Sequence, residues 1–238
     1  QGWSAPTADQ PCLITHDEMV TVFHEMGHVL HHLLTRIDYP SVGGINGVPW
    51  DAVELPSQFM ETFAWEPEVV ALCSGHYQSG EPLPGEILAS LRASKNFQSA
   101  LQMVRQLEFA LFDLRIHAEY DPATGARVMD ILAEVRDAVA VIRPPEWNRF
   151  AHAFTHIFGG GYAAGYYSYK WAEVLAADAF AAFEESGLFN PELARRFREQ
   201  VLEIGGSRDI GDAFVAFRGR PAHVDALLKQ SGIERAPA

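Results

Sequence analysis

Apolar residues in this chain recur at intervals close to 3.6 residues, which predicts a protein built from α-helices. Thr15 is followed three residues later by Glu18, a pair that predicts a capping box at the start of the first helix. The Asp38-Tyr39-Pro40 sequence supplies a stop signal for this helix. Between these two points, apolar or small residues share one helical face at Val20, Phe23, Gly27, Leu30 and Leu34.

The same periodicity continues along the chain, interrupted by glycine, proline and asparagine. Asn96 and Asn190 are expected to be N-caps, and residues 147–158 to form a loop. Residues 1–14 are expected to form a loop or a short strand around Cys12-Leu13-Ile14. We therefore expect an all-α fold with little β structure, and no linker divides residues 1–238 into separate domains. Further helices are expected over residues 51–65, 69–74, 84–95, 97–120, 126–142, 163–185, 190–203, 210–218 and 221–230.

Charge and composition narrow the classes of function. The formal net charge of -13 argues against a nucleic acid or an anionic membrane as a partner, because both require a basic surface. No apolar run is long enough to span a bilayer, and the first residues lack the pattern of a signal peptide. Cys12 and Cys73 form no C-x-x-C pair, so a cysteine zinc site is not expected. These features favour a protein of the reducing cytoplasm.

The first predicted helix contains His24-Glu25-Met26-Gly27-His28, an H-E-x-x-H pattern. In a helix, His24 and His28 lie one turn apart on the same face, so both imidazoles can bind one metal ion. Glu25 lies beside them and can act on a metal-bound water. The alternative is a chance match, in which the histidines are buried with hydrogen-bond partners of their own.

A catalytic zinc ion usually takes three protein ligands and leaves one position for water or substrate. Glu54 lies just before Pro56 in the first turn of the next helical segment, where it can point back toward the histidines. Glu61 can then hold a ligating histidine in the right tautomer. Taken singly, each carboxylate of this segment could instead be an exposed acid at a helix start. His31 and His32 are expected to pack against neighbours or to support the ligands. The carboxylates that this segment offers are Asp51, Glu54 and Glu61.

Three tyrosines follow a glycine-rich stretch near the start of the helix expected over 163–185. Tyr162, Tyr166 and Tyr169 are spaced to share one helical face. Several phenols beside a flexible stretch suggest a polar cavity, and phenol donors suit the oxyanion of acyl hydrolysis by zinc. His156 could add another donor. The alternative is an aromatic stripe in the core.

Three separated segments resemble, in this order, the thimet-type oligopeptidases (the M3 zinc metallopeptidases), in particular the bacterial members. The resemblance runs from about His16 to the closing Phe217–Pro221. Met26 departs from the phenylalanine that is usual in the family, but this exchange of apolar residues should not affect the ligands. Because members of the family are far longer, the resemblance implies that this chain is their carboxy-terminal catalytic portion. The matching segments are residues 24–35, 47–61 and 160–169.

The resemblance also implies a role for each candidate residue. One Zn²⁺ ion would be held by His24, His28 and Glu54, with Glu25 as the general base. The loop over 41–49 would match the family's glycine-rich flexible loop; from its sequence alone it could be a gate or an ordinary surface connection.

The tyrosine segment would complete the site, with Tyr169 as the best match to the tyrosine that stabilises the oxyanion. The further catalytic groups would be Tyr162 and His156. The substrate-binding groups would be Tyr166, Gly160 and Gly161.

The activity implied by this resemblance is that of a zinc-dependent endopeptidase acting on internal bonds of short, unstructured peptides. One alternative is a dipeptidyl carboxypeptidase, which the family also contains. Another is a helical metal-binding fragment without turnover, although zinc retention alone would need neither Glu25 nor the row of tyrosines.

Overall fold

The computed structural model describes residues 3–233, and within this range the chain is all-α, as the periodicity predicts. Of the two alternatives for Cys12–Ile14, the loop is confirmed, since no β-strand forms in the described part of the chain. An isolated bridge between Asp121 and Gly125 closes the exposed turn that joins α6 to α7. The helices are α1 (His16–Leu33), α2 (Trp50–Val53), α3 (Leu55–Phe63), α4 (Pro67–Cys73), α5 (Gly85–Ser94), α6 (Ser99–Ala118), α7 (Val128–Val139), α8 (Phe150–Ala153), α9 (Thr155–Phe158), α10 (Ser168–Ser186), α11 (Pro191–Phe197), the π-helical η1 (Arg198–Leu202), α12 (Ile210–Arg218) and α13 (Asp225–Gln230).

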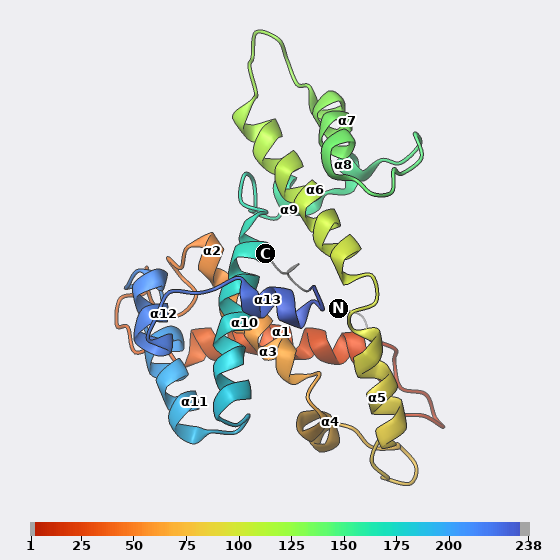
Figure 1. Ribbon diagram of the computed structural model, residues 1–238, viewed down its shortest axis with the longest axis vertical. Helices are drawn as coiled ribbons and strands as arrows, with labels where there is room; N and C mark the ends of the chain where they lie inside the picture. Colours follow the sequence, from red (N-terminus) through yellow and green to blue (C-terminus); the bar gives the residue numbers. More distant parts are fainter. Residues whose placement is uncertain (1–2, 234–238) are drawn as a thin grey trace, which may run out of the picture.

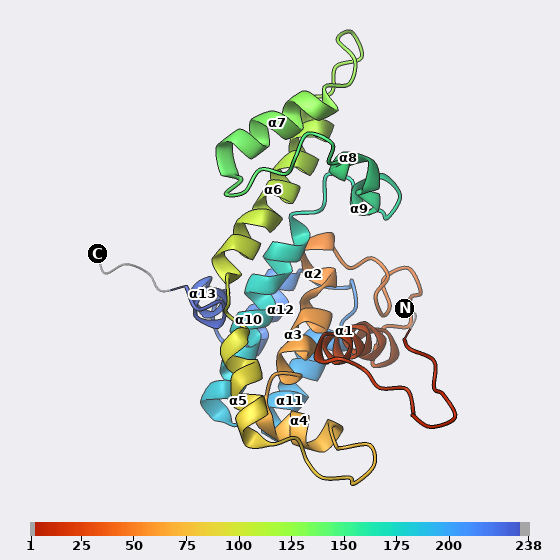
Figure 2. The same ribbon diagram turned by 90° about the vertical axis from the view of Figure 1, so that its right-hand side faces the viewer.

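The helices form a main body and a projecting arm (Figures 1 and 2). In the body, α3 packs between α1 and α10, and α12 packs against η1. The arm consists of α6 and α7 side by side, with α8 and α9 next to them (Figure 2). Between residues 3 and 233, no helix combines the length and the apolar character needed to cross a membrane.

Each part has its own hydrophobic core. The body cluster joins α3, α10, α11, η1 and α12, and its centre is a stack of Phe59 on Phe197 with ring centroids 4.2 Å apart. The arm cluster joins α6 to α9 and includes the fully buried Phe112. Tyr166 belongs to the arm cluster, whereas α10, which begins two residues later, belongs to the body cluster. The chain segment between them therefore connects the two cores.

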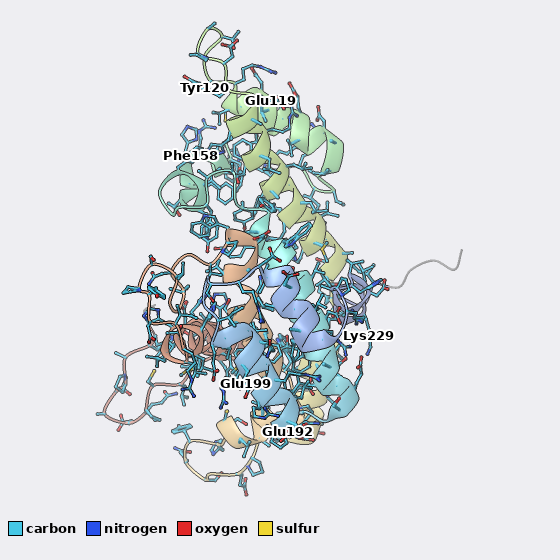
Figure 3. All side chains as sticks on the ribbon, turned by 90° about the vertical axis from the view of Figure 1, so that its left-hand side faces the viewer. Glu119, Tyr120, Phe158, Glu192, Glu199 and Lys229 are labelled. Carbon is cyan, nitrogen blue, oxygen red and sulfur yellow. The ribbon has the colours of Figure 1, made fainter. Side chains whose placement is uncertain are left out.

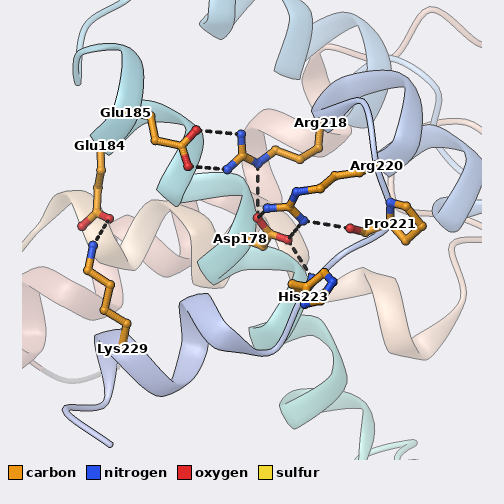
Figure 4. A network of polar contacts seen from close by, with 8 residues as sticks. All are labelled: Asp178, Glu184, Glu185, Arg218, Arg220, Pro221, His223 and Lys229. Carbon is orange, nitrogen blue, oxygen red and sulfur yellow. Dashed lines mark hydrogen bonds and ion pairs between the residues drawn. The ribbon is translucent and has the colours of Figure 1, made fainter. Parts of the chain in front are cut away.

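A buried carboxylate fixes the segment that follows α12 against α10 (Figure 4). Asp178 accepts hydrogen bonds from the guanidinium groups of Arg220 (2.7 Å) and Arg218 (3.2 Å) and from the backbone N–H of His223 (2.7 Å). Arg218 also pairs with Glu185 at 2.6 Å. Burial alone would raise the pKa of Asp178, but the hydrogen bond from Arg220 and its other partners outweigh burial and lower it. The exposed Glu192 and the half-buried Glu199 lie on the outer surface of the same body (Figure 3).

The cap predicted at Asn190 is confirmed, because its Oδ1 accepts the backbone N–H groups of Glu192 and Leu193 at 3.0 and 3.1 Å. The cap predicted at Asn96 is wrong. Gln98 adopts a left-handed conformation with φ of 56°, so α6 begins at Ser99.

Three further predictions need correction. The segment expected as one helix over 51–65 is divided at Glu54, which ends α2 and precedes α3. The helix expected from residue 163 begins at Ser168, because residues 163–167 form turns and Ala164 has φ of 54°. The loop expected over 147–158 contains the short helices α8 and α9. A single domain stays a prediction, and the ends of that domain, 1–2 and 234–238, lie outside the described residues.

Candidate metal centre and active site

The H-E-x-x-H sequence lies in the middle of α1, and the predicted capping box at the start of this helix is confirmed. The backbone N–H of Thr15 donates to Glu18 Oε2 at 2.7 Å, and the N–H of Glu18 donates to Thr15 Oγ1 at 3.2 Å. These bonds satisfy backbone donors that a helix start leaves without partners. His24 and His28 lie one turn apart, with ring centroids separated by 4.9 Å.

Gly27 allows α1 to approach the next helices closely. A Cβ atom at this position would lie 2.4 Å from the backbone oxygen of Pro56, so only glycine fits between the two backbones. Glu54 lies at the break between α2 and α3 and is 3% exposed. The close approach and the break together direct the carboxylate of Glu54 toward α1.

Three possible metal ligands converge here. Glu54 Oε2 lies 3.4 Å from His24 Nε2 and 3.2 Å from His28 Nε2, and one ligand atom of each residue lies within 4.8 Å of the others. Burial disfavours the charged carboxylate, but hydrogen bonds, of which the one with His28 is the largest, lower the pKa of Glu54 to about 2. Two imidazole nitrogens and an ionised carboxylate form a donor set that fits zinc.

Neighbouring groups orient these ligands. Glu61 Oε1 lies 2.6 Å from His24 Nδ1, so a proton on Nδ1 leaves Nε2 free to face the centre. Burial lowers the pKa of His24, but the bond to Glu61 and nearby carboxylate charges outweigh burial and raise it. The Ser57 hydroxyl lies 2.7 Å from Glu54 Oε2, and the Tyr162 hydroxyl donates to Glu54 Oε1 at 2.7 Å.

Glu25 points to the outside of α1. It is exposed and lines a surface depression together with Trp3 and Met26. Its negative charge contributes to the raised pKa of His24, after the larger effects of burial and of Glu61. Its role as general base stays a prediction.

The three tyrosines meet although they do not share one helical face. Tyr162 stacks on Tyr169 with centroids 4.8 Å apart, and the ring of Tyr166 lies 5.2 Å from that of Tyr169. The ring of His156 lies within 6.3 Å of all three. Burial raises the pKa of both Tyr162 and Tyr169, so each phenol keeps its proton at neutral pH and can donate a hydrogen bond.

Tyr166 faces the arm. Its hydroxyl donates to Gln106 Oε1 at 2.9 Å, its side chain is 9% exposed, and burial raises its pKa to about 12. Gly160 and Gly161 are exposed, and Gly161 has φ of 87° beside the ring of Trp50. A role of these residues in substrate binding stays a prediction.

The glycine-rich loop over 41–49 is attached to the body. The N–H of Gly206 donates to the carbonyl of Val42 at 2.9 Å, and the N–H of Ile45 lies 3.5 Å from His32 Nδ1. The loop thus contacts the far end of α1, and its mobility stays a prediction.

Sequence reasoning missed three residues that support the site. Ser57 lies three positions after Glu54, a spacing that could have indicated a contact. The ring of Trp50 packs against that of Tyr162 with centroids 4.5 Å apart, and Gln58 donates from Nε2 to the carbonyl of Tyr169 at 3.1 Å. The last two contacts join segments more than 100 residues apart in the chain, so no local signal could have shown them.

A family model described as peptidase family M3 matches residues 1–233 of the chain. The chain is 57% identical over 232 residues to oligopeptidase A of Escherichia coli and 54% identical over 231 residues to oligopeptidase A of Haemophilus influenzae. It is 37% identical over 236 residues to the dipeptidyl carboxypeptidase of Escherichia coli. These alignments cover 97–98% of this chain but 34% of each relative, so the chain spans about a third of their length.

Proposed function

Because the chain belongs to peptidase family M3, we propose that it forms the catalytic portion of a zinc-dependent endopeptidase that cleaves short, unstructured peptides at internal bonds. The observation that carries this proposal is the convergence of His24, His28 and Glu54, whose ligand atoms lie within 4.8 Å of one another. Three such ligands would hold one Zn²⁺ ion and leave a position for water or substrate. The similarity to oligopeptidase A supports peptides as substrates.

The residues around the centre have complementary roles in this reaction. A bound zinc ion would lower the pKa of a water ligand toward ~7 and polarise the peptide carbonyl. Glu25 would accept the proton of the attacking water and return it to the departing amine. Tyr169, which keeps its proton, would donate a hydrogen bond to the oxyanion, and His156 would add a donor. Tyr162 keeps its proton as well but donates it to Glu54 Oε1, so Tyr162 would act by orienting this ligand.

The substrate would lie along the exposed turn beside the tyrosines. Gly160 and Gly161 carry no side chains that could block a peptide backbone there, and Tyr166 would form the adjoining wall. We also propose that the chain is one domain and works in the cytoplasm, where the exposed free cysteines Cys12 and Cys73 would stay reduced.

The test is cleavage of a quenched-fluorescence peptide by this chain, with zinc and after chelation. We expect zinc-dependent cleavage, and we expect Glu25→Gln to keep its zinc while turnover falls by roughly 10³-fold or more. Asp17→Asn removes an exposed acid from the same helix and is the matched control. Full turnover in Glu25→Gln would exclude Glu25 as the base, and zinc binding without any turnover in the wild type would favour a non-catalytic metal-binding fragment.

The second candidate is a dipeptidyl carboxypeptidase, favoured by the 37% identity to that enzyme of Escherichia coli. The products of an amino-blocked peptide separate the two functions. Internal cleavage supports the endopeptidase, whereas successive release of dipeptides from the carboxyl end supports the alternative.

A further inference from the structure

A buried carboxylate outside the candidate metal centre binds the backbone of the turn between Tyr162 and Tyr166. Asp113 lies on α6 and is fully buried. Its Oδ1 accepts the backbone N–H of Ala164 and its Oδ2 accepts the backbone N–H of Tyr166, both at 2.9 Å. Both oxygens of one side chain therefore bind the same turn, whose residues Ala164 and Tyr166 lie 51 and 53 positions further along the sequence.

A histidine one turn along α6 completes this contact. His117 Nδ1 lies 2.8 Å from the carbonyl oxygen of Asp113 and 3.0 Å from its Oδ1. Since both neighbours are acceptors, Nδ1 carries the proton and donates. His117, a residue of the same helix, thus holds the carboxylate of Asp113 in the orientation that binds the turn.

The turn that Asp113 binds has a shape that its sequence does not favour. Ala164 has φ of 54°, a left-handed conformation that an L-residue other than glycine adopts at a cost. The two hydrogen bonds that Asp113 accepts from the N–H groups of Ala164 and Tyr166 offset this cost. Without them, we expect Ala164 to return to negative φ, which would rotate the neighbouring residues.

The shape of this turn decides where Tyr162 and Tyr166 lie. Tyr162 precedes the strained residue and donates to Glu54 Oε1, while its ring stacks on Tyr169. Tyr166 follows the strained residue and is held at its hydroxyl by Gln106 of α6. A change at Ala164 would therefore move Tyr162 relative to Glu54.

We propose that Asp113 is a positioning residue, whose carboxylate holds the turn at Ala164 so that Tyr162 reaches Glu54 and stacks on Tyr169. Its role in turnover rests on the proposed function, whereas its role in zinc binding rests on the contact between Tyr162 and Glu54. Asp113 acts through the backbone of the turn and touches neither the metal ligands nor the substrate.

The test compares Asp113→Asn with Glu108→Gln. Glu108 is an equally buried acid on the same helix, but it pairs with Arg105 and Arg136 and has no bond to the turn. In Asp113→Asn, we expect the amide protons of Ala164 and Tyr166 to exchange roughly tenfold faster and zinc affinity to fall by about tenfold. We expect kcat to fall roughly 10- to 100-fold with little change in KM. Glu108→Gln should lower the unfolding free energy, because it leaves two guanidinium groups without their buried carboxylate, but it should leave zinc affinity, kcat and KM of the folded protein near the wild-type values.

A second variant separates positioning from general stability. Glycine adopts φ of 54° without strain, so adding Ala164→Gly to Asp113→Asn should restore part of the amide protection and part of the zinc affinity. Unchanged exchange in Asp113→Asn, the same losses in Glu108→Gln, or no recovery in the double variant would each overturn the proposal. If the wild type shows no turnover, the endopeptidase proposal fails, while amide exchange and zinc affinity still decide the role of Asp113.

Discussion

At the scale of single residues, the side chain of Glu54 links the two histidines of α1 to the tyrosine segment. One of its oxygens faces His24 and His28, and the other accepts the hydroxyl of Tyr162. Its pKa of about 2 keeps it ionised over the whole range in which proteins function. The negative charge that a metal ion requires is therefore present, and already oriented, before any ion binds.

Glu61 should determine how well His24 serves as a ligand. Glu61→Gln weakens the 2.6 Å contact with His24 Nδ1, and such supporting partners typically contribute 10- to 100-fold to metal affinity. We expect the zinc dissociation constant to rise by roughly that factor, measured by competition with a chelator. The control is Glu68→Gln, an exposed acid on α4, which should have no effect. An unchanged constant in Glu61→Gln would show that His24 is oriented by packing alone.

His31 should make the zinc-free protein sensitive to acid. It is 3% exposed, neither ring nitrogen has a hydrogen-bond partner, and burial and the nearby charges of His28 and His32 lower its pKa to about 4. In the unfolded chain its pKa returns to about 6.5, so between these values the unfolded state binds more protons. The free energy of unfolding should therefore fall as pH drops from 6.5 toward 4, by roughly 2 kcal/mol at pH 5 relative to pH 7.

Denaturant unfolding of the chelated protein at several pH values measures this effect. His31→Leu should remove most of this slope, whereas the same substitution at the exposed His152 should leave it. Equal slopes in the wild type and His31→Leu would assign the acid sensitivity to other groups.

At the scale of elements, the sequence predicts those helix starts and helix faces that depend on neighbouring residues alone. The capping box at Thr15 and the period of α1 are local, and so is the cap at Asn190. The break at Glu54 and the turn before Ser168 are not local, because each depends on partners from another part of the chain. The sequence therefore identified the histidine pair and the three tyrosines as candidates. It placed the tyrosines on one helical face, whereas α10 begins only at Ser168.

The contact between α1 and α3 should be the element most sensitive to added volume. In Gly27→Ala, the new methyl group would lie 2.4 Å from the backbone oxygen of Pro56, and the helices must separate. We expect a loss of about 1–3 kcal/mol in unfolding free energy together with weaker zinc binding, since Glu54 moves away from α1. Gly85→Ala, at a position with open space, should cost nothing. Wild-type zinc affinity in Gly27→Ala would mean that the ligands do not depend on this spacing.

At the scale of the whole molecule, body and arm both contribute to the candidate metal centre. The three possible ligands come from α1 and from the break between α2 and α3 in the body, whereas Tyr166 belongs to the arm cluster and Tyr169, at the start of α10, packs against that cluster. The site is therefore complete only when arm and body are both folded and correctly placed (Figure 1). The ion pairs of Asp178 stabilise the body side of this arrangement, because they attach the segment that follows α12 to α10.

Neutralising Asp178 should destabilise the whole body. Asp178→Asn leaves two guanidinium groups near a buried position without their shared carboxylate, a change that typically costs about 3 kcal/mol. Chemical denaturation measures the loss, and Asp130→Asn, an exposed acid on α7, is the control. A loss no larger than that of Asp130→Asn would show that water replaces the missing carboxylate.

The turn between α6 and α7 is a suitable site for attaching a label or a tag. Residues 120–127 are all exposed, and this turn forms the outer tip of the arm (Figure 1). Exposed tips of this kind tolerate insertions. A fluorophore or an affinity tag attached between Asp121 and Gly125 should therefore leave zinc affinity unchanged, which titration of the labelled protein with zinc measures.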